Sequence, residues 1–87
     1  VLLCGTGMGI SMAANRFPGI RAAVCVRPEM ALLAREHNDA NVICLGKRLN
    51  TLRECVNLLD TFLETPFSNG ERHLRRISKM DRVTGEG

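Results

Sequence analysis

Three short apolar runs, each followed by a segment with helical features, restrict the fold of this chain more than any other feature. The runs lie at residues 1–4, 21–26 and 41–46. Strands that are apolar along their whole length are typical of a parallel sheet covered on both faces. The alternation therefore predicts an α/β fold with a parallel sheet between two layers of helices.

Four helices are expected after these runs, over residues 10–16, 28–37, from 51 and 71–80. Pro28 suits a first helical turn, because its missing N–H would be unpaired there. Thr51 followed by Glu54 is a capping-box pattern. The stripes expected to be buried comprise Met30, Leu33 and Ala34 in one helix, and Leu52, Cys55, Val56, Leu59 and Leu63 in the next.

The length of 87 residues allows one domain at most. Three strands leave open sheet edges and a small core, so we expect the chain to be the C-terminal half of a longer domain. Residues 1–80 would form this part of the domain, and residues 81–87 a C-terminal tail.

The net charge of +3 is concentrated between residues 70 and 82, where five basic residues accompany two acidic ones. Such a cluster suits a phosphate, a nucleic acid or an acidic surface, although a solvated helix face is the plainer explanation. A nucleic-acid-binding module is a weak interpretation, because three Phe and no Trp or Tyr offer little stacking surface.

The four cysteines form no C-x-x-C pair and have no zinc-type spacing, so we expect no metal site. Their apolar surroundings favour free thiols in a cytoplasmic, reducing compartment. We find no signal-peptide pattern and no apolar run of ~18 residues, which argues against a membrane segment.

A glycine-rich loop, C-G-T-G-M-G at residues 4–9, joins the first expected strand to a helix. Its N–H groups can form an anion-binding nest at the helix N-terminus, although a tight turn is an equally good reading of the loop alone. The spacing is not that of a dinucleotide fingerprint, because Ile10 occupies the third glycine's place, and a P-loop's lysine is missing. At this position Cys4 could be a reactive thiolate, the alternative being an inert buried thiol.

Other candidate residues lie near helix ends. His37 can interact with the terminal carbonyls of its helix, and a structural role is the commoner one for such a histidine. Asn38 suits the C-cap of that helix. Arg72 and Arg76 are spaced i, i+4, so both guanidinium groups can grip one phosphate.

Four motifs in one order closely resemble the ribose-5-phosphate isomerase B family, which also includes allose-6-phosphate and galactose-6-phosphate isomerases. They are C-G-T-G-M-G-I-S-M-A-A-N, A-R-E-H-N-D-A-N-V, L-G-K-R and R-H-L-R-R. The likeness covers about residues 1–80 and the second half of that family's domain. It implies a Rossmann-like three-layer α/β/α sandwich, of which about three strands and four helices are present.

The resemblance also implies an activity, the conversion of ribose 5-phosphate to ribulose 5-phosphate through a cis-enediolate. The implied catalytic residues are Cys4 as the base, Thr6 in ring opening or orientation, and His37 from the partner subunit in opening the furanose. The implied sugar-binding residues are Gly5, Gly7, Met8, Gly9 and Asn38. The implied phosphate-binding residues are Arg48, Arg72, His73 and Arg76.

No metal or organic cofactor is implied, and the expected assembly is a homodimer or tetramer with shared active sites. The 87-residue chain alone is expected to be inactive or nearly so. The main alternative is a phosphocysteine carrier that resembles the IIB components of sugar phosphotransferase systems. Such a carrier also places a cysteine before a glycine-rich loop, but it needs no second phosphate clamp like the pair Arg72 and Arg76.

Overall fold

The fold is built around a sheet of three parallel strands in the order β1-β3-β2. The computed structural model describes the backbone of residues 1–86 and the side chains of residues 1–82. The strands are β1 (Leu2–Cys4), β2 (Ala22–Val24) and β3 (Val42–Gly46). β3 is central, with Leu45 opposite Leu3 of β1 and Ile43 opposite Ala23 of β2. The predicted parallel α/β architecture is confirmed.

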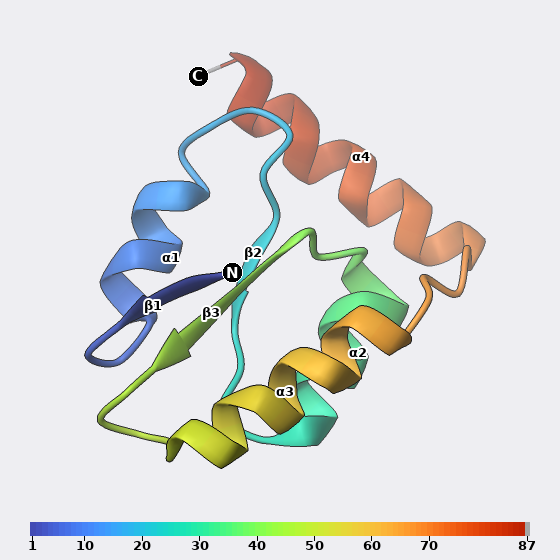
Figure 1. The fold of residues 1–87 in the computed structure, drawn as a ribbon. Coiled ribbons are helices and arrows are strands. Elements are labelled where there is room, and N and C mark those ends of the chain that lie inside the picture. Colours follow the sequence, from blue (N-terminus) through green and yellow to red (C-terminus); the bar gives the residue numbers. More distant parts are fainter. Residues whose placement is uncertain (87) are drawn as a thin grey trace.

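Helices cover both faces of this sheet (Figure 1). They are α1 (Met8–Ala14), α2 (Pro28–Asn38), α3 (Leu52–Glu64) and α4 (Glu71–Glu86). α1 links β1 to β2 across the central strand, and α2 returns the chain to that strand. Because both crossovers connect parallel strands in opposite directions, the right-handed rule places α1 on one face and α2 on the other. α3 packs beside α2, and α4 contacts α2 as well.

Local sequence signals set several helix boundaries. Pro28 occupies the first turn of α2, as expected. Thr51 caps α3: its hydroxyl accepts a hydrogen bond from the Glu54 N–H at 3.2 Å, and the Glu54 carboxylate accepts one from the Thr51 N–H at 2.7 Å. This confirms the predicted capping box. α1 begins earlier than expected, at Met8, because Gly7 takes up a left-handed backbone conformation at its N-cap.

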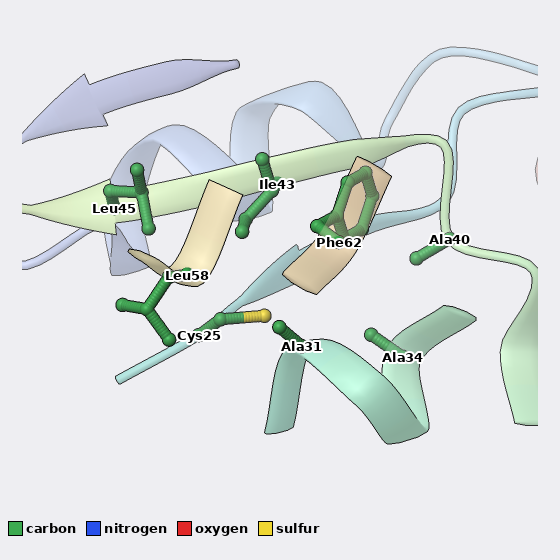
Figure 2. Close-up of a cluster of buried hydrophobic side chains, with 8 residues drawn as sticks. All are labelled: Cys25, Ala31, Ala34, Ala40, Ile43, Leu45, Leu58 and Phe62. Atoms are coloured by element: carbon green, nitrogen blue, oxygen red, sulfur yellow. The ribbon is translucent and has the colours of Figure 1, made fainter. Parts of the chain in front are cut away.

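The core lies between the sheet and the helix pair α2 and α3 (Figure 2). Its members come from β3, from α2 and α3, and from the segments that follow β2 and α2: Cys25, Ala31, Ala34, Ala40, Ile43, Leu45, Leu58 and Phe62. The alanines of α2 let that helix approach closely, while Leu58 and Phe62 fill the space beneath α3. A cation–π contact covers the edge of this core, with the Arg35 guanidinium 5.6 Å from the Phe62 ring centroid.

The predicted buried stripes were correct only in part. Cys55, Leu59, Met30 and Ala34 do pack in or against the core. Four others are exposed: Leu33, Leu52, Val56 and Leu63, with Leu52 at 82% and Leu63 at 71%. For the three residues of α3 the reason is that this helix has a wide apolar surface, and only the side bearing Leu58 faces α2 and β3. Leu52 and Val56 instead line a groove beside the open edge of β1.

The last helix extends beyond the expected residues 71–80. α4 continues as a helix to Glu86, and Gly87 lies outside the described residues. Asp81 lies within α4 and forms an ion pair with Arg21, 3.3 Å away, just before β2. This pair ties the C-terminal part of α4 to the body of the fold.

Candidate active site

The loop at residues 4–9 wraps its backbone around the sulfur of Cys4. Cys4 ends β1, and its Sγ accepts a hydrogen bond from the Gly7 N–H at 3.0 Å. Gly7 has φ +83°, a conformation that turns its N–H back towards the sulfur and that L side chains rarely adopt. α1 starts at the next residue, and the Ile10 N–H of its first turn also acts on the thiol.

This environment changes the acidity of Cys4. Partial burial alone would raise the pKa of the thiol, because it disfavours a charged sulfur. The N–H groups of Gly7, Ile10 and Thr6, together with the nearby Lys47 ammonium, outweigh that effect and bring the pKa below its ordinary value. A thiolate held in this way is a usable base or nucleophile.

The end of β3 supports the loop from behind. The N–H groups of Lys47 and Arg48 donate to the carbonyls of Cys4 and Gly5, both at 2.9 Å. A Cβ at Gly46 would lie only 2.6 Å from the carbonyl carbon of Thr6, so the loop rests directly on the strand backbone. The glycine at residue 46 therefore allows this close approach, a role that the sequence reasoning did not assign.

The remaining side chains around the loop also have defined places. The Thr6 hydroxyl accepts a hydrogen bond from the Met8 N–H at 3.3 Å, so it turns towards the start of α1. The Met8 side chain is exposed, and a Cβ at Gly9 would meet nothing within 4 Å, so this side of the loop is open. Arg48 lies against the other side, because a Cβ at Gly5 would come 3.4 Å from its Nε.

A second group of polar residues forms where α2 and α4 meet. We call His37, Arg72, His73 and Arg76 the histidine cluster. The rings of His37 and His73 are stacked, with centroids 4.5 Å apart and planes 15° apart. Nη2 of Arg76 contacts Nδ1 of His73. His73 is only 8% exposed, and desolvation, His37, Arg76 and Arg72 together lower its pKa.

Asn38 was expected to be the C-cap of α2, and this prediction is wrong. It is the last residue of α2, and the C-cap is Asp39, with φ 46° and ψ 45°. Asp39 is one of the residue types that tolerate this left-handed conformation, and its position leaves Asn38 inside the helix. Asn38 lines a cavity of about 530 Å³ beneath α4, together with Arg21 and Asp81.

Two arginines that the sequence reasoning missed hold the end of α2. Arg35 donates to the Asp39 carboxylate at 2.8 Å and to the carbonyls of Ala40 at 2.6 Å and Thr65 at 3.0 Å. Arg21 pairs with Asp39 at 3.4 Å and donates to its carbonyl at 3.0 Å. The i, i+4 spacing could have indicated the Arg35–Asp39 pair. No sequence signal indicated Arg21.

The Cys4 loop and the histidine cluster lie at opposite ends of the sheet. The loop follows the carboxyl end of β1, whereas His37 comes shortly before β3 begins. Figure 1 shows α4 crossing the end of the sheet remote from the loop between β1 and α1. The five residues of β3 separate the two groups by roughly 13 Å along the strand. Arg48 lies at the Cys4 end, apart from Arg72 and Arg76.

Other kinds of site are not found in the described part of the chain. No three His, Cys, Asp or Glu side chains among residues 1–82 are arranged to hold a metal ion. The described helices are also too short or too polar to cross a membrane. All four cysteines are free, and burial with the neighbouring Cys44 raises the pKa of Cys25 to about 11.

Comparisons with known proteins agree on one family. The ribose/galactose isomerase family model matches residues 1–80. A probable ribose-5-phosphate isomerase B of Mycoplasma genitalium is 46% identical over 86 residues, covering 99% of this chain and 56% of the relative. Ribose-5-phosphate isomerase B of Escherichia coli is 43% identical over 83 residues, covering 95% and 55%.

Solved structures show the same arrangement. The type B ribose 5-phosphate isomerase of Trypanosoma cruzi has a TM-score of 0.95 at 45% identity, covering 99% of this chain and 57% of its own. The Mycoplasma genitalium enzyme with bound ribulose-5-phosphate has a TM-score of 0.93 at 46% identity, covering 99% and 56%. The chain thus spans about half the length of the relatives that it matches. It belongs to the ribose/galactose isomerase family.

Proposed function

We propose that the protein is an aldose–ketose isomerase that converts ribose 5-phosphate to ribulose 5-phosphate, with Cys4 as the base. The observation that carries this proposal is the sulfur of Cys4, held by backbone N–H groups at a helix N-terminus and made more acidic by them. The names of the relatives support the substrate, and one relative's structure contains ribulose-5-phosphate.

The chemistry suits this loop. Isomerisation needs one base that removes a proton from C2 of the open-chain sugar and returns it to C1, or the reverse. The oxygens at C1 and C2 carry negative charge in the enediolate, and N–H donors that are already oriented stabilise that charge. In this proposal the backbone of Gly5 to Gly9 supplies such donors beside the Cys4 sulfur, and Thr6, in the same loop, orients the sugar.

The separation of the two groups supports an active site shared between subunits. Because one chain holds Cys4 and His37 at opposite ends of its sheet, His37 reaches the Cys4 loop only from a second copy. Under a two-fold axis each copy gives its loop to one site and its histidine cluster to the other. In that arrangement His37 opens the furanose ring and Asn38 binds the sugar.

Phosphate binding follows from the same geometry. Arg48 of one copy, beside the loop, and Arg72 and Arg76 of the other would enclose the phosphate from two sides. Guanidinium groups suit this task, because their donors match phosphate oxygens in pairs. The four free cysteines support a cytoplasmic location.

The first test uses the protein expressed from its natural gene, here called the natural protein. Cys4→Ala should abolish turnover of ribose 5-phosphate. Inorganic phosphate should still compete with the sugar phosphate for binding, because the arginines proposed to hold the phosphate are unchanged. Cys55→Ala, which removes another free and half-buried thiol, is the matched control and should keep its activity. Near-normal kcat in Cys4→Ala contradicts the base assignment. Transfer of label to Cys4 from a phosphorylated donor protein would instead identify a phosphocysteine carrier.

A second test addresses the shared site. Cys4→Ala and His37→Asn should each be inactive alone. When the two are mixed and their subunits exchange, half of the dimers are mixed, and each mixed dimer has one site without a substitution. About a quarter of the natural activity should therefore return. If no activity returns although exchange is verified by mass, Cys4 and His37 do not act in a site built by two subunits.

A further inference from the structure

His73 occupies the seam between α2 and α4, where its ring is almost fully enclosed. Its exposed fraction is 8%, whereas Arg72 and Arg76 on the same helix are exposed. The turn before α4 is shaped around this ring. A Cβ at Gly70 would lie 2.9 Å from Cδ2 of His73, so a side chain at that position would collide with the imidazole. The glycine at residue 70 therefore leaves the space that the His73 ring occupies.

One face of the ring contacts His37. The centroid distance of 4.5 Å and the angle of 15° describe a parallel stack. A stacked flat partner limits the tilt of the His37 ring, which lies near the C-terminal end of α2. The segment before α4 also binds this end of α2, because the Ser68 hydroxyl and N–H donate to the Glu36 carbonyl at 2.7 and 3.2 Å.

The edge of the same ring contacts Arg76, and this contact determines the protonation state of His73. A guanidinium has only donors, so Nδ1 of His73 must accept the hydrogen bond from Nη2 of Arg76. The ring is then neutral and carries its proton on Nε2. The titratable and charged groups facing it are His37 from α2 and Arg72 and Arg76 from α4, and they also disfavour a cationic ring.

We propose that His73 is a positioning residue, which as a neutral Nε2–H imidazole sets the plane of the His37 ring and the direction of the Arg76 guanidinium together. It would thus couple the ring-opening group to the phosphate clamp through one side chain, instead of contacting the phosphate itself. The expected effect on catalysis rests on the proposed function. The tautomer of His73 and its contacts with His37 and Arg76 do not.

The tautomer can be measured without any assay of activity. In the natural protein labelled with ¹⁵N at histidine, we expect His73 to show an unprotonated Nδ1 and a protonated Nε2 between pH 6 and 8. Its titration midpoint should lie below that of a histidine in a denatured sample. A protonated Nδ1, or a midpoint equal to the denatured one, would overturn the proposal.

Two substitutions of His73 test its contacts with His37 and Arg76 one at a time. His73→Phe keeps a flat ring for His37 but offers no acceptor to Arg76. His73→Asn offers an acceptor near the position of Nδ1 but removes the ring. Arg75→Ala is the control, because it removes one exposed positive charge from α4 outside the histidine cluster. Circular dichroism of each variant checks that the fold is kept.

Opposite responses are expected from the two variants. His73→Phe should weaken inorganic phosphate binding about tenfold and leave the ring-current shifts of His37 in place. His73→Asn should keep phosphate affinity within about threefold, lose those shifts and lower kcat. Equal behaviour of both variants in phosphate affinity and His37 shifts would contradict the proposal. If the natural protein lacks isomerase activity, the proposed function fails, and the NMR readouts still decide the role of His73.

Discussion

Gly46→Ala tests how closely the Cys4 loop depends on the strand behind it. The new Cβ would lie 2.6 Å from the carbonyl carbon and 2.7 Å from the Cα and oxygen of Thr6. These are backbone atoms, so no side-chain rotation relieves the contact. Ordinary van der Waals contact starts at 3.4 Å, and the loop must therefore move by roughly 0.8 Å.

That movement acts on two hydrogen bonds. The bonds from Lys47 and Arg48 to the loop carbonyls of Cys4 and Gly5 are 2.9 Å long, and a displacement of this size would stretch them beyond the normal range. Overpacking of a close contact costs about 1–3 kcal/mol of unfolding free energy. We expect turnover to fall strongly as well, because a misplacement of a catalytic group by near 1 Å can cost roughly 100-fold in rate.

The assay combines urea unfolding of the natural protein, at fixed protein concentration, with the pH dependence of Cys4 alkylation. Gly46→Ala should lower the unfolding free energy by about 1–3 kcal/mol and move the Cys4 thiol pKa back towards its ordinary value. Gly9→Ala is the stability control, because a Cβ there meets nothing within 4 Å and alanine favours the helix. If Gly46→Ala is as stable as Gly9→Ala and Cys4 titrates as before, the loop does not rest on β3 in the way described.

Three further predictions concern the thiols, a helix cap and the core. Cys4 should be alkylated by iodoacetamide at a lower pH than a free cysteine, while Cys25 should stay unmodified until the protein unfolds; reaction of both at one rate would contradict the pKa shifts. Thr51→Ala should cost about 1 kcal/mol in urea unfolding, because the capping box is lost; no change would show that the box adds nothing. Leu58→Ala should cost about 2–5 kcal/mol and Leu63→Ala under about 0.5 kcal/mol, since only the first is buried; equal losses would refute the packing described.

We expect the histidine cluster to make the docking of α4 depend on pH. His73 has a lowered pKa in the folded protein, so its contribution to stability is fully present above the ordinary histidine pKa of about 6.5. The contribution is lost as the pH falls through the folded-state pKa, because the unfolded chain then binds a proton that the native ring resists. Unfolding midpoints of the natural protein should therefore fall more between pH 7 and 5 than those of His73→Phe. Parallel curves would show that His73 does not contribute.

The local features of this protein could be read from its sequence. The parallel sheet was predicted from three apolar runs, because only a doubly covered sheet makes strands apolar on both faces. The N-terminal boundaries of α2 and α3 were predicted from Pro28, Thr51 and Glu54, whose effects act within one turn of helix. The Cys4 loop was predicted as a nest because glycine spacing and the start of a helix are also local properties.

The tertiary structure decided everything that depends on contacts between distant residues. The strand order placed β3 in the centre and so brought Gly46 against Thr6, a contact between residues 40 positions apart. The wide apolar surface of α3 could not reveal which side would be covered, and for this reason Leu52 and Leu63 were predicted to be buried. Hydrophobic spacing indicates a face, but the neighbouring elements decide how much of that face they cover.

The same distinction holds for the site. Cys4, His37 and the Arg72–Arg76 pair could be named from sequence patterns and family resemblance, because side-chain chemistry and spacing are carried by the chain itself. Their division between two ends of the sheet follows from the direction of each helix relative to its strand, which a residue list does not contain. The stack of His73 on His37 likewise needs α4 to lie across α2, and only the folded chain brings these two helices together.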